Sequence, residues 1–77
     1  MLKGVTINEI EAIFAVIERF AISREAVIIP LKPSTPGVVR RLPNGKVEIV
    51  VDSGQPFEEW LAWLERQLRE LTGRITP

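Results

Sequence analysis

The sequence of 77 residues predicts a single small α+β domain over residues 1–77, in the order helix, strand, strand, strand, helix. Apolar residues recur at helical spacing near both ends of the chain, and a hairpin motif lies between these two segments. Neither helix can bury its apolar side alone, whereas a small sheet has an apolar face to offer. We therefore expect two helices packed on one face of a three-stranded antiparallel sheet.

The first helix is expected over residues 6–21, where the apolar residues follow a helical period. Thr6 followed by Glu9 fits a capping box, in which the hydroxyl and the carboxylate each accept a backbone N–H. Val16 lies off the main apolar stripe, which indicates that this helix makes contacts on more than one side. No glycine marks the end of the helix, and the turn is placed at residues 23–25.

Residues 26–31 form a short run rich in β-branched side chains, which predicts the first strand. Pro30 has no N–H to donate to a ladder, so it should lie either in an edge strand or at the end of a strand. The next six residues, 32–37, include two prolines and a glycine and predict a loop.

The strongest local pattern is a hairpin within residues 38–52. Pro43 suits the second position of a type I turn, and Gly45 suits the left-handed position that completes a three-residue loop. This turn predicts a register with an apolar face and a mixed face that carries a cross-strand ion pair. The predicted pairs are Val39 with Ile49, Arg40 with Glu48, and Arg41 with Val47.

Residues 52–55 form a short connection to the second helix. Pro56 suits the first turn of that helix, because its missing N–H would have no partner there. Gly73 is a natural C-cap. A long amphipathic stripe lies between them, formed by Phe57, Trp60, Leu61, Leu64, Leu68 and Leu71.

Composition excludes several kinds of chemistry. The chain has no Cys and no His, which excludes disulfides, ordinary zinc sites and every nucleophile activated by an imidazole. We therefore expect a non-catalytic protein without a metal or cofactor. Acidic residues at Glu9 and Glu11 interrupt any signal-peptide core, and no apolar run approaches the ~20 residues that span a bilayer. A cytoplasmic protein without membrane contact is the expectation.

The leading functional hypothesis is a protein-interaction module that uses the second helix, with a second copy of the chain as the simplest partner. Trp63 lies roughly 100° from the centre of the apolar stripe, and a Trp beside such a stripe is a typical interface anchor. The alternative is that Trp63 covers a sheet edge or the first helix. The predicted interaction surface consists of Trp60, Trp63, Gln67 and Val16.

The alternative function is nucleic-acid binding through the loop and hairpin. Four basic residues and no acidic residue lie between positions 32 and 46, and a compact positive patch is typical of phosphate binders. No aromatic residue interleaves with these bases to stack on nucleotides. The predicted Arg40–Glu48 pair would also neutralise part of the patch. The basic residues are Lys32, Arg40, Arg41 and Lys46.

The order of elements resembles that of double-stranded-RNA-binding domains, and this resemblance covers most of the chain. The resemblance implies a helix-strand-strand-strand-helix architecture. That family places a Lys-rich motif at the start of its second helix, where this chain has Pro56, Phe57, Glu58 and Glu59. The family's His-bearing loop corresponds to residues 32–37, which contain no His. The family's RNA contacts are therefore not implied for this sequence.

Overall fold

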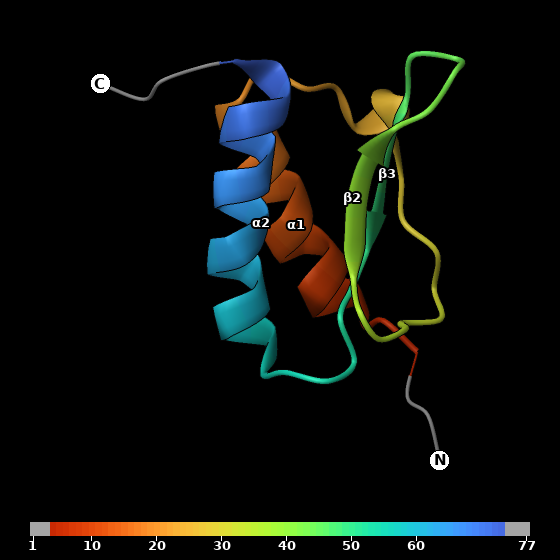
Figure 1. Ribbon diagram of the computed structural model, residues 1–77. Helices are drawn as coiled ribbons and strands as arrows, with labels where there is room; N and C mark the ends of the chain where they lie inside the picture. The colour runs from red at the N-terminus through yellow and green to blue at the C-terminus, as the bar shows by residue number, and fades with distance from the viewer. Residues whose placement is uncertain (1–3, 74–77) are drawn as a thin grey trace.

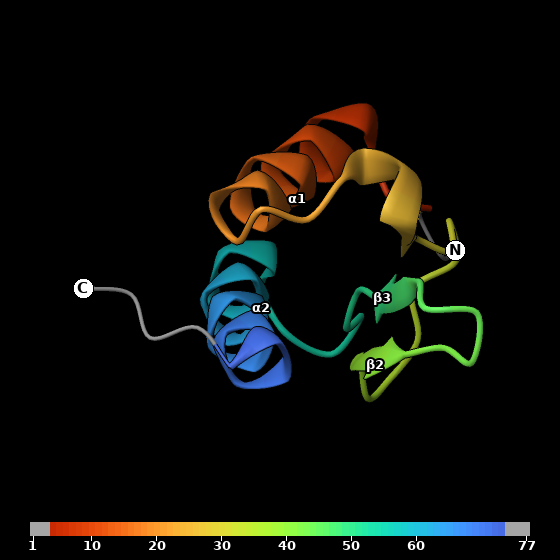
Figure 2. The ribbon, with the colours of Figure 1, turned by 90° about the horizontal axis from the view of Figure 1, so that it is seen from above.

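The computed structural model describes residues 4–73 and contains two helices and a three-stranded sheet. Both helices lie on the same side of the strands in two perpendicular views (Figures 1 and 2). The predicted α+β class and order of elements are confirmed. The elements are α1 (Ile7–Arg19), the 3-10 helix η1 (Arg24–Ala26), β1 (Val27–Ile28), β2 (Val38–Arg41), β3 (Val47–Val50) and α2 (Phe57–Thr72).

The sheet is mixed, with the order β1-β3-β2, so the prediction of a fully antiparallel sheet is wrong. β1 pairs in parallel with β3, and Val27 lies opposite Val47. Successive strands do reverse direction along the chain, but residues 29–37 carry it past β3 to the far side. β1 and β3 therefore run the same way and become neighbours. β1 is also shorter than the predicted 26–31.

The hairpin between β2 and β3 has the predicted register, including Arg40 opposite Glu48. The Leu42 N–H donates to the Lys46 carbonyl at 2.7 Å, which closes the loop. Gly45 has a φ of 87°, the left-handed conformation that the turn requires.

The start of α1 is the predicted capping box. The Glu9 N–H donates to the Thr6 hydroxyl at 3.1 Å, and the Thr6 N–H donates to the Glu9 carboxylate at 2.9 Å. The end of α1 is a Schellman motif, in which Ile22 N–H donates to Ile17 C=O at 3.1 Å. Ala21 occupies the left-handed position with a φ of 59°, where glycine is usual. The end of α2 follows the prediction, because Gly73 has a φ of 68°.

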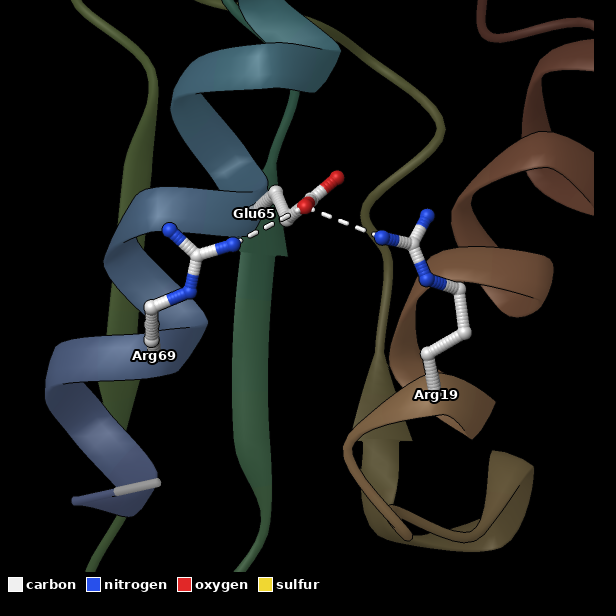
Figure 3. Close-up of polar contacts among 3 residues, drawn as sticks. All are labelled: Arg19, Glu65 and Arg69. Carbon is white, nitrogen blue, oxygen red and sulfur yellow. Dashed lines mark hydrogen bonds and ion pairs between the residues drawn. The ribbon is translucent and has the colours of Figure 1, made fainter. Parts of the chain in front are cut away.

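One core joins the two helices to the sheet. Glu65 of α2 also links the two helices by accepting from Arg19 of α1 at 2.9 Å, and it accepts from Arg69 of its own helix at 3.1 Å, as Figure 3 shows. These side chains are partly exposed, so each pair contributes only about 0–1 kcal/mol, and the packed apolar core dominates. The buried residues are Ile13, Val16, Ile17, Phe20, Val47, Ile49, Val51, Trp60, Leu64 and Leu68.

Candidate protein-interaction surface

Two residues of the predicted interaction surface lie in the core. Trp60 is 0% exposed, and its ring packs against Phe57 and Trp63 with centroid distances of 5.6 and 6.5 Å. Val16 is 5% exposed. α1 contacts both α2 and the segment around η1, so its buried sector is wider than one stripe and includes Val16. Trp60 and Val16 are therefore removed from the interaction surface.

Trp63 and Gln67 are half-buried and lie together on one flank of α2. The opposite flank faces α1, because Glu65 forms its ion pair with Arg19 there. Trp63 and Gln67 are each two positions from Glu65, which places them about 160° away around the helix axis. α2 also contacts β2, and β2 lies farther from α1 than β3 does (Figure 2). Trp63 and Gln67 therefore lie on the flank of α2 that is turned toward β2.

β2 is an edge strand with one unpaired side, because β3 occupies its other side. Hydrogen-bonded and non-hydrogen-bonded residue pairs alternate along an antiparallel ladder. The Leu42 N–H is hydrogen-bonded to the Lys46 carbonyl. By this alternation, the backbone groups of β2 that form hydrogen bonds to β3 belong to residues 38 and 40. The N–H and C=O groups of Val39 and Arg41 therefore point to the open side. In the described part of the chain, no element lies beside β2 there (Figures 1 and 2).

The four predicted basic residues are all exposed, but they do not form one patch. Arg40 donates to Glu48 at 2.6 Å on the sheet face opposite the helices. Arg41 lies on the helix side, since it is opposite the buried Val47. Lys32 lies at the other end of the sheet from the hairpin, where Val5 N–H donates to Leu31 C=O. Lys46 belongs to the hairpin loop, so the positive charge is divided among separate surfaces.

A cavity of about 330 Å³ lies where the first turns of α1 and α2 approach the end of β3. Asp52 lines it, and this carboxylate accepts from Gly54 N–H at 2.7 Å and Gln55 Nε2 at 3.3 Å. The N–H groups of Gly54 and Gly37 lower the pKa of Asp52 below its ordinary value of 3.8. The carboxylate is thus engaged in shaping its own turn. Within residues 4–73, no group of three or more acidic side chains is placed to hold a metal ion.

No protein-family model, curated protein or solved structure matches this chain. None of the helices within residues 4–73 is both long enough and apolar enough to cross a membrane.

The open edge of β2 is the part of the candidate surface that sequence reasoning missed. Its residues were recognised as a strand, but nothing local indicates whether β1 joins β2 or β3. The two alternatives leave different strands at the edge. We name the region formed by Trp63, Gln67 and the open side of β2 the α2–β2 surface.

Proposed function

We propose that this chain is a non-catalytic protein-interaction module that binds a protein partner through the α2–β2 surface. The observation that carries the proposal is the half-buried Trp63 on the flank of α2 turned toward an unpaired strand. Tryptophan is enriched among the residues that dominate binding energy, because it combines a large apolar ring with a polar N–H. An unpaired strand adds backbone groups that another chain can bond.

The charge distribution also favours a protein partner. Ten basic and ten acidic residues leave no bulk attraction to a polyanion. Arg40, at the centre of the basic segment, is already paired with Glu48. The remaining basic side chains lie on different surfaces, so they do not follow a phosphate backbone as a continuous stripe.

Sedimentation equilibrium over a concentration series tests whether the partner is a second copy. Affinity capture from a lysate, repeated with Trp63→Ala, tests for a different protein. Loss of Trp63 at an interface should weaken the contact by about 2 kcal/mol, or roughly thirtyfold in Kd. Glu58→Ala is the matched control, because Glu58 is exposed and lies about 140° from Trp63 around the axis of the same helix.

A strict monomer that captures the same proteins with and without Trp63 would contradict the proposal. Circular dichroism of both variants verifies that α2 is retained. The nucleic-acid alternative would instead be supported if the chain bound RNA or DNA in a salt-dependent way and if Arg40→Ala and Arg41→Ala weakened that binding.

A further inference from the structure

The open side of β2 offers a short row of backbone groups of known position. Val39 and Arg41 each direct one N–H and one C=O outward, as the alternation of the ladder requires. The row ends near the hairpin because Leu42 bonds to Lys46 and Pro43 has no N–H. It ends at the other side at Gly37, whose N–H donates to the Asp52 carboxylate. Such a row accommodates one extended segment of only a few residues.

The side chains along this row are basic on both faces of the sheet. Arg40 lies on the open face, and Arg41 lies on the helix side, as their partners Glu48 and Val47 establish. Arg41 has no ion-pair partner among residues 4–73. An extended segment alternates its side chains between the two faces, so those on the helix side meet Arg41, while Arg40 on the open face is already paired with Glu48.

The same charges disfavour a second copy at this position. Two β2 strands paired with each other would bring four arginines into one short ladder, and like charges across a strand pair are destabilising. Charged residues on an edge are also a common protection against pairing between identical edges. A segment that carries carboxylates removes this repulsion and forms charge-assisted contacts.

We infer that the open edge of β2 accepts an extended acidic segment of a partner protein as a fourth strand. This inference rests on the proposed function and identifies the partner's chemistry. The backbone groups of Val39 and Arg41 form the ladder, and Arg41 selects for a carboxylate, while Arg40 remains paired with Glu48. The flank of α2 with Trp63 and Gln67 lies on the helix side of the same strand and borders the added segment there.

The test is an NMR titration of the ¹⁵N-labelled full chain with a capped hexapeptide of alternating glutamate and valine. We expect saturable shifts of the Val39 and Arg41 amide signals. A capped hexapeptide of alternating lysine and valine is the control, and it should bind about tenfold or more weakly, because its charges are repelled. Equal binding of the two peptides, or shifts located away from β2, would overturn the inference.

Two variants separate the backbone from the charge contribution. Val39→Pro removes an outward N–H, while the bonds to β3 are made by residues 38 and 40. Arg41→Glu reverses the selecting charge, and Lys32→Glu makes the same change at the other end of the sheet. We expect Val39→Pro and Arg41→Glu each to reduce peptide affinity by about tenfold or more, and Lys32→Glu by less than about twofold.

Dispersion of the amide signals verifies that each variant is folded. If Val39→Pro does not fold, the acidic peptide with alternate backbone nitrogens methylated replaces it, and this peptide should fail to bind. Unchanged affinity for the methylated peptide, or for Arg41→Glu, would overturn strand addition. Absence of acidic-peptide binding together with an association that depends on Trp63 would overturn only this inference and leave the proposed function intact.

Discussion

The two ends of the sheet are both closed by tight turns, but these turns are held in different ways. The hairpin loop at residues 42–46 is closed by its own bonds, including Lys46 N–H to Asn44 Oδ1 at 3.0 Å. The opposite end joins residues 33–37 to residues 51–55. There, the Ser34 N–H donates to the Val51 carbonyl at 3.1 Å, and the Thr35 and Ser53 hydroxyls lie 2.6 Å apart. We call this end the junction.

A glycine serves each end for a different physical reason. Gly45 in the hairpin has a positive φ, and a Cβ placed on it would meet no atom within 4 Å. At Gly37 in the junction, a Cβ would lie 2.7 Å from the Val50 carbonyl oxygen and 2.8 Å from the Asp52 nitrogen. The hairpin therefore depends on backbone conformation, and the junction depends on close approach of two chain segments.

Among substitutions at the two ends of the sheet, Gly37→Ala is expected to lower the free energy of unfolding most. The added methyl group contacts backbone atoms that cannot rotate away, so β2 must move relative to the end of β3. We expect the free energy of unfolding to fall by about 3 kcal/mol. This is the upper end of the usual cost of inserting an extra carbon into a well-packed region. Urea denaturation measures this loss. A loss below about 1 kcal/mol would contradict this expectation, because it would mean that the two chain segments move apart at little cost.

Gly45→Ala is the matched substitution in the hairpin, and its expected effect is smaller. The methyl group has room, but alanine is strained at positive φ, which lowers the free energy of unfolding by about 1 kcal/mol. The same denaturation series compares the two variants. A loss as large as that of Gly37→Ala would contradict the distinction between conformation and close approach.

Asp52→Asn should have the smallest effect at neutral pH, because Asp52 is only half-buried and an amide oxygen can still accept from the Gly54 N–H. The N–H groups of Gly54 and Gly37 lower its folded pKa, so the ionised form stabilises the junction. That stabilisation is present above the unfolded pKa near 3.8 and is lost as the pH falls through the lowered folded value. We expect Asp52→Asn to be less stable than the parent at neutral pH.

The pH dependence provides the control for Asp52. Unfolding midpoints measured from neutral to acid pH should converge for the parent chain and Asp52→Asn, because protonation removes the same interaction from the parent. A difference that stays constant over the whole pH range would assign the effect to packing rather than to charge.

Local chemistry predicted the parts of the fold that are closed by neighbouring residues. The hairpin register, the capping box of Thr6 and Glu9, and the C-cap at Gly73 follow from residues within one turn of each other. The end of α1 did not follow, because Ala21 adopts the left-handed conformation without the usual glycine. Bonds from Ala21 and Ile22 back to the last turn hold it there.

The remaining misassignments concern contacts between distant segments. The antiparallel pairing of the hairpin could be predicted, but the parallel pairing of β1 with β3 depends on which edge the loop 29–37 crosses. Helical period placed Trp60 on the apolar stripe and Trp63 and Gln67 beside it, but it could not show that Val16, off the stripe of the first helix, is enclosed by neighbouring elements. The candidate surface was therefore half predictable: its helix came from periodicity, and its strand edge required the sheet order.

The order β1-β3-β2 also has a consequence for the sequence of folding events. The central strand is the last of the three along the chain, so neither β1 nor β2 has a neighbour until β3 is present. Val27 pairs with Val47, which lies twenty positions later in the sequence, whereas the hairpin pairs residues that are close in the sequence. Because longer loops close at a greater entropic cost, the hairpin should form first and provide the template on which β1 docks. A nascent chain that has not yet reached residue 47 thus contains strand sequences but no sheet.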